Sequence, residues 1–444
     1  MAKRSKILEE LSEIIVEREV LELDNLDIGV LHELTSEMSE ISDTRDASYV
    51  RHKLSDIIMI VLLAVLAGAN EWGEIEVFGQ EKYAWLKKFL ELRNGVPTDD
   101  TYRIVVSKIN PHYLYELMKC FFIKKVEQIV KIYKKDDEEK DIIACDGKVS
   151  KGSKRQKISG EIKPLNTLSA YSVGKEACLD QEFIEEKTNE ITAMPKLLKR
   201  IDLKNAIVTC DALNTQIKVV KTVIEQGGDY VMALKGNHKT LMSDVVDYFD
   251  DETTKEIIKK NEKSKIEGMD KNYKKSIEKE RSSVVTREYF LEKNIEWLYG
   301  KKEWAGLLAI GMERKTTQKL NVKEEEPKIE YRYYLSSVTD ISDFSRAVRS
   351  HWGVENSLHW HLDFTFKDDH NTSTKDNSAQ GLQMFKKIAL IALKFAQAVY
   401  PKSTSIKNIR YRLSLSFEKE IEKIFTILNV QNFFQCFSKN DNIA

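Results

Sequence analysis

Two aspartates follow short apolar runs of similar composition. The run "IIAC" precedes Asp146, and the run "AIVTC" precedes Asp211, sixty-five residues further on (211 − 146). Runs this apolar are typical of strands that are covered on both faces. If the two strands are neighbours in one sheet, their carboxylates lie side by side, and such a pair either shares a proton or binds a metal ion. Carboxylate oxygens suit Mg²⁺. It remains open that each aspartate merely caps the helix or turn that follows it.

A second kind of chemistry is suggested by the segment "DIIACDGKVSKGSK", residues 141–154. Gly147 and Gly152 have the G-x-x-x-x-G spacing of a phosphate-binding loop. That pattern requires Lys and then Ser or Thr as the next residues. Here Ser153 comes first and Lys154 second, so the lysine that must reach the phosphates is misplaced. The sequence therefore argues against nucleotide hydrolysis and against a nucleotide cofactor.

A third carboxylate can come from "RSHWGVENSLHWHLDFTFKDDH", residues 349–370. Residues four apart share one face of a helix, so a helical stripe here carries His351, Glu355, His359 and Asp363. Glu355 is then placed to join the two aspartates. The histidines lack the H-E-x-x-H pattern, and a structural zinc site normally needs four ligands in a compact pattern. We therefore expect them to pack or to contact a polar ligand.

The elements that must position these residues change in character along the chain. The N-terminal region looks almost wholly helical, with a thirteen-residue apolar run at 57–69 that Ser55 would cap and Gly68 would end. Thirteen residues are too few to cross a bilayer, so we expect a buried core helix and no membrane partner. A mixed-charge run at 134–141 then marks a linker. After it, strands alternate with helices, which predicts an α/β sheet with some parallel pairing.

This pattern predicts five regions. They are a helical N-terminal domain at 1–135, for which a DNA-binding unit and a domain that only packs on its neighbour both stay open, the first part of an α/β core at 140–240, a β-rich insertion at 241–338, a Glu-bearing helix with the end of the core at 339–400, and a C-terminal helical tail at 401–444.

The bulk composition sets wide limits. The chain has 444 residues, of which 32% are charged and 42% hydrophobic, as in a globular protein with room for two or three domains. Its 70 Lys and Arg nearly balance its 71 Asp and Glu, so net charge neither favours nor excludes a nucleic-acid partner. Five scattered cysteines without C-x-x-C spacing indicate reduced thiols, and hence a cytoplasmic location.

Several sequence blocks occur together in one order. They are "DGKVSKGS", "EKTNEITAMPKLLKRIDLKNAIVTCDALNTQ", "GGDYVMALKGNHKTL" and "RSHWGVENSLHWHLDFTF". These blocks resemble the signature blocks of bacterial insertion-sequence transposases of the H-repeat-associated group, which carry a DDE catalytic triad. The earlier segment "DTRDASYVRHKLSDIIMIVLLAVLAGANEWGEIEVFG" also resembles the helical domain that precedes the catalytic core in that group. Together the blocks cover roughly residues 42–400.

The resemblance implies a fold, a reaction and a set of partners. The fold is α/β, with a ribonuclease H-like core whose acids correspond to Asp146, Asp211 and Glu355 and whose chain carries a β-rich insertion before the glutamate. The reaction is Mg²⁺-dependent cleavage at the insertion-sequence ends, followed by attack of the freed 3′-OH on target DNA. Two Mg²⁺ ions, for which Mn²⁺ would substitute, would lie about 3.5 to 4 Å apart on these acids. DNA would be the partner, bound by a homodimer or a higher oligomer, with its ends recognised by the helical domain at 1–135 and the reaction carried out by the core at 140–240 and 339–400.

Basic and polar residues near the acids are the predicted DNA contacts. Lysine and arginine side chains beside an acidic centre can hold the phosphates that the metal ions cleave. For each of them, a solvated surface charge is the alternative. No helix-turn-helix pattern is clear enough to assign a recognition helix. The predicted contacts are Lys148, Lys151, Lys154, Arg155, Lys235, Asn237, His351, Trp352 and Asn356.

The chain departs from the group's pattern in three places. Val348, His351 and Leu362 stand where Tyr, Arg and Lys are often found, the acidic pair is Asp368–Asp369 where Glu-Asp is usual, and "NTSTKDN" has one lysine where arginine is frequent. Two alternatives therefore stay open, a catalytically impaired transposase-derived DNA-binding protein and a metal-dependent nuclease of the same fold. A hydrolase that acts on no nucleic acid is a third.

Overall fold

The computed structural model describes most of the chain. The described residues are 9, 11–12, 29–133, 139–156, 162–184, 189–250, 255, 272–280, 282–320, 326–401 and 403–428. The last part of the predicted C-terminal tail, residues 429–444, lies outside them.

Residues 29–133 form helices and no strand. The apolar run forms α3, in which residues 54–66 are all buried. This helix begins at Leu54 with Lys53 as its N-cap, so the prediction that Ser55 caps it is wrong, whereas Gly68 does end it. The helices are α2 (Gly29–Met38), α3 (Leu54–Ala67), α4 (Trp72–Glu81), α5 (Tyr83–Leu86), α6 (Asp99–Lys108) and α7 (Pro111–Tyr133), with a 3-10 turn at Ala47–Tyr49.

None of the described helices is by itself long and apolar enough to span a membrane. Taken together, α3 and α4 have the length and composition for it, but the pair is bent by 97°.

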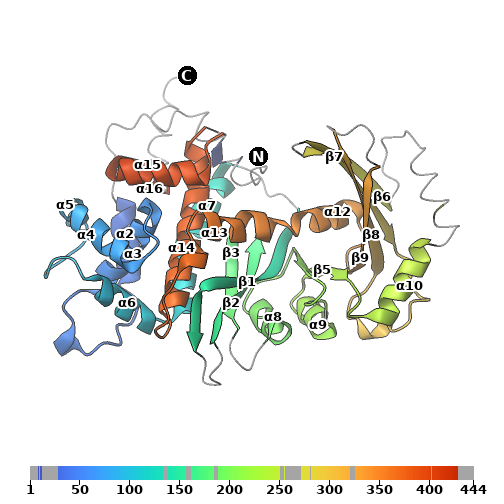
Figure 1. Ribbon diagram of the computed structural model, residues 1–444, viewed down its shortest axis with the longest axis horizontal. Coiled ribbons are helices and arrows are strands. Elements are labelled where there is room, and N and C mark those ends of the chain that lie inside the picture. Colours follow the sequence, from blue (N-terminus) through green and yellow to red (C-terminus); the bar gives the residue numbers. More distant parts are fainter. Residues whose placement is uncertain are drawn as a thin grey trace.

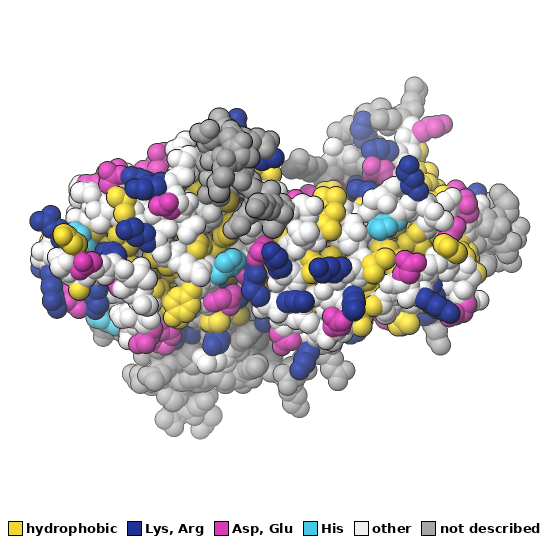
Figure 2. Space-filling model, turned by 90° about the horizontal axis from the view of Figure 1, so that it is seen from below, with side chains coloured by type: hydrophobic (Ala, Val, Ile, Leu, Met, Phe, Trp, Pro, Cys, Tyr) yellow, Lys and Arg dark blue, Asp and Glu magenta, His cyan; other side chains and the backbone are white. Residues whose placement is uncertain are grey.

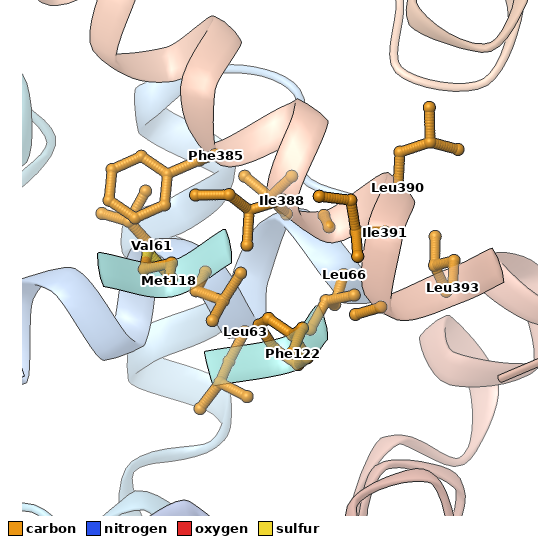
Figure 3. Close-up of a cluster of buried hydrophobic side chains, with 14 of the residues drawn as sticks. Val61, Leu63, Leu66, Met118, Phe122, Phe385, Ile388, Leu390, Ile391 and Leu393 are labelled. Atoms are coloured by element: carbon orange, nitrogen blue, oxygen red, sulfur yellow. The ribbon is translucent and has the colours of Figure 1, made fainter. Parts of the chain in front are cut away.

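The last helices of the chain pack onto this N-terminal block. They are α14 (Ser378–Ala396), α15 (Ile406–Leu415) and α16 (Phe417–Leu428). Every residue of α14 is buried, because the helix stands between the N-terminal helices and the sheet (Figure 1). Figure 3 shows side chains of α3, α7 and α14 interdigitating, among them Leu63, Phe122 and Ile388. The two ends of the described chain therefore share one hydrophobic core.

One nine-stranded mixed sheet forms the other half of the molecule. Its order is β3-β2-β1-β4-β5-β9-β8-β7-β6. The pairs β1–β4 and β4–β5 are parallel, and the remaining pairs are antiparallel. The fold is thus mixed α/β. The strands are β1 (Asp141–Gln156), β2 (Ile162–Ser172), β3 (Ala177–Phe183), β4 (Ala206–Cys210), β5 (Asp229–Leu234), β6 (Tyr273–Glu280), β7 (Ser283–Glu292), β8 (Ala309–Lys319) and β9 (Lys328–Ser336).

Helices cover both faces of the sheet (Figure 1). On one face lie α8 (Glu190–Leu198), α9 (Ile217–Glu225) and α10 (Lys239–Asp250), whose apolar side chains share a core with β4 and β5. On the other face lies α12 (Ile341–Ser350), which shares a smaller core with the same strands. Strands covered on both faces are expected to be continuously apolar, as the "AIVTC" of β4 is.

The four strands β6 to β9 extend the sheet of the first five. The last of them, β9, pairs directly with β5, from Val231 opposite Ser336 to Leu234 opposite Tyr333. From the end of β9, α12 leads the chain back over the sheet toward β1. The β-rich segment therefore shares a sheet with β1 to β5, and the predicted domain boundaries remain predictions.

Candidate active site

Asp146 lies inside β1, at the point where the pairing of β1 with β4 ends. Cys145 is opposite Cys210 in the parallel ladder, and Asp146 is opposite Ser169 of the antiparallel neighbour β2. Because the ladder with β2 carries β1 on to Gln156, the prediction that this strand ends at Asp146 is wrong. The side chain of Asp146 is 23% exposed.

Asp211 is the first residue after β4. Since Cys145 and Cys210 face each other, Asp146 and Asp211 are the next residues on two adjacent parallel strands. The carboxylate of Asp211 is fixed by Asn214, whose backbone N–H donates to Oδ1 at 3.2 Å and whose side-chain Nδ2 donates to it at 3.0 Å. The two aspartates therefore emerge at the same edge of the sheet.

Glu355 reaches this edge from the segment that follows α12. It is the first residue of a π-helical turn, Glu355–His359, in which the N–H of Trp360 donates to the carbonyl of Glu355. The regular α-helix then resumes as α13 (Trp360–Phe364). A π-turn inserts one extra residue per turn, so the prediction of one regular helix through this segment is wrong. Glu355 itself is exposed.

The electrostatics of Asp146 connect these acids. Burial raises the pKa of Asp146 to about 7; the backbone N–H of Gly147 acts in the opposite direction, and the negative charges of Glu355, Asp211 and Glu190 add to the rise. Burial and like charges both disfavour the ionised carboxylate unless a cation compensates. The surroundings of Asp146 therefore favour a proton or a metal ion.

Glu190, the first residue of α8, is an acid that the sequence analysis missed. Its carboxylate lies against the backbone of Gly147, where a Cβ atom would meet its Cδ at 2.8 Å. The side-chain Nδ2 of Asn214 donates to its Oε2 at 3.2 Å. No spacing rule in the sequence points to Glu190, and only its position at the start of a helix between β3 and β4 could have suggested it.

Two family models match the chain. The one described as "Transposase DDE domain" matches residues 137–392, more than half of the 444 residues, and the one described as "DDE_Tnp_1-associated" matches residues 35–122. The chain belongs to the DDE transposase family. Members of this family cut DNA or transfer its strands, and DDE domains use divalent metal ions.

Curated relatives agree with this family. "Putative transposase YncI" of Escherichia coli O157:H7 is 34% identical to this transposase over 398 residues, which are 87% of this chain and 93% of the relative. "H repeat-associated putative transposase YhhI" of Escherichia coli (strain K12) is 32% identical over 361 residues, 81% of this chain and 90% of the relative. The resemblance to the H-repeat-associated group is thereby confirmed.

A solved chain of the piggyBac transposase synaptic complex with hairpin DNA matches 98% of this chain and 84% of its own length. At 12% identity and a TM-score of 0.34, this likeness carries no weight for the fold of the transposase.

Three partly buried histidines of this transposase have lowered pKa values, which favour the neutral imidazole. Nδ1 of His351 lies 3.1 Å from Thr209 Oγ1 of β4, Nδ1 of His359 lies 3.5 Å from Asp146 Oδ2, and Nδ1 of His361 lies 3.1 Å from the Thr365 hydroxyl. Burial is the main cause that lowers their pKa values, to about 4 for His351 and about 3 for the other two. The contact of His359 with Asp146 is therefore not an ion pair.

The predicted DNA contacts along β1 divide into buried and exposed side chains. Lys148 is buried, its Nζ contacts the carboxylate of Asp363, and it lies 3.6 Å from Asp369 Oδ1. Lys148 is therefore paired with acids inside the protein, and its contact with DNA remains a prediction. Lys151 and Lys154 are exposed, and Lys151 Nζ is 3.5 Å from Asp369 Oδ2. The prediction for Arg155 falls on a side chain outside the described residues.

The other predicted contacts lie nearer to β4 and Glu355. Lys235, Asn237 and Asn356 are exposed, and Asn237 Nδ2 donates to the carbonyl of Ala212 at 2.7 Å, which ties its loop to the residue after Asp211. Trp352 is 37% exposed and stacks with the Arg332 guanidinium at 5.1 Å. On the face seen from below in Figure 2, basic and acidic side chains are interspersed.

The carboxylates around Asp146 have the chemistry to bind a divalent cation, although they are not close enough together to surround one in this structure. Within the described ranges, no three carboxylate, imidazole or thiol groups converge closely enough to hold a metal ion. The acids supply only oxygen donors, which Mg²⁺ prefers. Across the described chain, none of the carboxylates of Asp146, Asp211, Glu190 and Glu355 forms an ion pair with lysine or arginine. A cation would neutralise this unpaired negative charge.

Proposed function

We propose that this protein is a DNA transposase that cuts DNA at the ends of an insertion sequence and joins the freed 3′-OH to target DNA. Asp146, Asp211 and Glu355 are its catalytic, metal-binding acids. The observation that carries the proposal is a half-buried Asp146 whose pKa is raised by burial and by the acids of three other elements, in a chain of the DDE transposase family. The proposal includes a cytoplasmic location.

The strands β3-β2-β1-β4-β5 would be the ribonuclease H-like core of this enzyme. Three antiparallel strands and two parallel ones, with α8 and α9 as the connections on one face, bring Asp146 and Asp211 to one edge. The chain that returns from β9 through α12 adds Glu355. Ligands of open α/β sheets bind at the carboxyl ends of parallel strands, and Asp211 follows β4 directly while Asp146 follows the last residue of β1 that pairs with β4.

The acids would divide the metal ions among them. Asp146, Asp211 and Glu355 would hold the Mg²⁺ ions. When bound, such a pair of ions activates the attacking oxygen and stabilises the leaving oxygen in an in-line displacement. Asn214 orients Asp211 through two hydrogen bonds, and Nδ1 of His359 lies 3.5 Å from Oδ2 of Asp146.

DNA would approach over the exposed side chains around this edge. Lys151, Lys154 and Lys235 would contact phosphates, with Asn237 and Asn356 beside them. Trp352, stacked on Arg332, and the partly buried His351, which lies 3.1 Å from Thr209 Oγ1, would complete these contacts. Two ends must be brought together, so we propose a homodimer or higher oligomer on DNA.

Three charge-removing variants test the assignment. Asp146→Asn, Asp211→Asn and Glu355→Gln each remove a metal-binding oxygen charge while keeping the shape of the side chain. We expect each to abolish Mg²⁺-dependent cleavage of a duplex that carries the inverted repeat flanking the coding region, with unchanged binding of that duplex in a gel-shift assay.

The control is Glu225→Gln, the same kind of change on the exposed side of α9, where Glu225 faces Lys221 at 3.7 Å. It should cut like the wild type. Full cutting by any one of the three site variants contradicts the triad. A strand-joining assay on the cut product separates a transposase from a nuclease of the same fold, since only the transposase joins the 3′-OH to a second duplex.

A further inference from the structure

We propose that Glu190 is a fourth acid of the metal-binding site, held in place by Asn214 and given room by Gly147. This inference rests on the proposed function and extends the site from three elements to four. The fourth element is α8, whose first residue is Glu190.

The first support is the space at Gly147. A Cβ atom on this residue would lie 2.8 Å from Cδ and 3.1 Å from Oε2 of Glu190, and closer still to Oε1. Gly147 does not have a left-handed φ, so its backbone conformation does not itself require glycine. A side chain here would instead displace the carboxylate of Glu190, which lies against the backbone directly after Asp146.

The second support is the amide of Asn214, which is fully buried. Its Nδ2 donates to Oε2 of Glu190 at 3.2 Å and to Oδ1 of Asp211 at 3.0 Å. The Nδ2 of Asn214 therefore bridges the carboxylates of Glu190 and Asp211. Its own Oδ1 is buried and has no hydrogen-bond partner among the described residues, so this side chain, whose Nδ2 contacts both acids, still has an unused oxygen that could bind a ligand.

A purely structural role accounts poorly for Glu190. Acids are favourable in the first turn of a helix, but α8 already has a complete capping box between Asn189 and Thr192, with bonds of 3.0 and 3.1 Å. Glu190 has no ion pair with lysine or arginine in the part of the chain that the structure describes. Its charge instead adds to that of three other acids, which is costly unless a cation binds between them.

Glu190 would act with the three other acids as a ligand of one ion or of its bound water, and Asn214 is a positioning residue for it. Residues that orient metal ligands typically change metal affinity by about 10- to 100-fold when they are replaced. Removing Glu190 should therefore weaken metal binding in the full-length protein, even before any DNA is added.

The test is a titration of the full-length protein with MnCl₂. Calorimetry measures the Mn²⁺ affinity, and the increase of the melting temperature with added Mn²⁺ measures it independently. Glu190→Gln keeps the shape and an acceptor for Asn214 and removes the charge. We expect Mn²⁺ affinity at least tenfold lower than in the wild type, and a melting temperature in EDTA that is equal or higher, because one repelling charge is gone. A structural acid would instead lower the melting temperature in EDTA and leave Mn²⁺ affinity unchanged.

Gly147→Ala is the second variant, and it displaces the carboxylate without removing it. Because the obstructing atoms are the end of a flexible side chain, we expect this variant to fold and to show the same loss of Mn²⁺ affinity. Glu225→Gln is the matched control and should bind Mn²⁺ like the wild type.

The outcomes separate this inference from the proposed function. The role of Glu190 is overturned if Glu190→Gln binds Mn²⁺ with an affinity within twofold of the wild type. If Glu190→Gln does not fold, the same result in Gly147→Ala overturns it. If Asp146→Asn lowers the affinity in the same titration, the three-acid site stands without it. If neither Asp146→Asn nor Glu190→Gln changes Mn²⁺ binding, the proposed function and this inference both fail.

Discussion

At the scale of single residues, two glycines decide how closely β1 can be approached. Gly147 leaves room for the Glu190 carboxylate, a movable group, whereas Gly152 leaves room for main chain. A Cβ at Gly152 would collide with the carbonyl oxygen of Asp369 and would lie 3.1 Å from that of Asn371. The glycines that suggested a phosphate loop therefore allow protein groups to pack on β1.

The difference between the two glycines predicts unequal costs of the same substitution. Gly152→Ala should destabilise the protein by about 1–3 kcal/mol, because the backbone of residues 369–371 must move. Gly147→Ala should cost clearly less in EDTA, since only a side-chain end is displaced. Thermal unfolding followed by circular dichroism checks this, with Gly147→Ala as the control. A melting temperature of Gly152→Ala equal to that of the wild type would show that this packing is not tight.

At the scale of elements, a buried polar layer joins β1 to α14. The carboxylate of Asp368 is fully buried and accepts from Ser150 Oγ at 2.6 Å and Gln383 Nε2 at 3.1 Å, with Lys386 Nζ at 3.5 Å. Burial alone would raise the pKa of Asp368, but the charge of Lys386 and these hydrogen bonds outweigh it and lower the pKa. Buried charges persist only when they are paired and hydrogen-bonded. This layer therefore fixes the second half of β1.

The segment from α12 to α13 gives the protein a pH dependence. The folded-state pKa of His361 is about 3 because of burial, whereas an unfolded histidine titrates near 6.5. A folded pKa below the unfolded one means that the unfolded state binds the proton first. The stability contributed by neutral His361 is thus fully present above about pH 6.5 and is lost as the pH falls from there toward 3.

We therefore expect the melting temperature in EDTA to fall between about pH 6.5 and pH 4, and His361→Asn to reduce that fall. A single such group changes the free energy of unfolding by at most about 1.4 kcal/mol per pH unit. His370, an exposed-side neighbour on the 3-10 turn Asp368–His370, supplies the control variant His370→Asn. An unchanged pH profile in His361→Asn would show that this histidine does not stay neutral in the folded protein.

The sequence predicted those features of these elements that depend on neighbouring residues, and it missed those that depend on contacts between distant parts of the chain. The strands before Asp146 and Asp211 were predictable because apolar, β-branched runs are a local property. The burial of Lys148 was not, because it depends on contacts with Asp363 and Asp369, more than two hundred residues away in sequence, and the π-turn at Glu355 has no signal in the spacing of its residues. Glu190 was missed for the same reason, since its role depends on Gly147 and Asn214, which lie far from it in sequence.

At the scale of the whole molecule, Arg410 joins α15 to the end of α3 and to the segment that follows α13. This buried residue of α15 donates to the carbonyls of Val65 at 3.0 Å and Ala69 at 2.9 Å, at the C-terminal end of α3, and also to the carbonyl of Thr365 after α13. Its guanidinium lies over Phe366 at 4.5 Å. Five donors in a planar fork can satisfy several carbonyls at once. A region predicted as a C-terminal tail therefore closes the helical block.

Replacing Arg410 should loosen this junction. Arg410→Lys keeps the positive charge. The single ammonium group of lysine cannot reach all the carbonyls that the planar guanidinium of Arg410 binds, so the exchange is not conservative. Each buried carbonyl left without a donor costs about 1–3 kcal/mol. We expect a melting temperature well below that of the wild type, and faster proteolysis of the C-terminal helices. The control is Arg412→Lys, on the exposed side of the same helix. Equal melting temperatures for the two variants would contradict the role of Arg410, whereas a selective loss would show that the helical block depends on a contact between the first and last thirds of the chain.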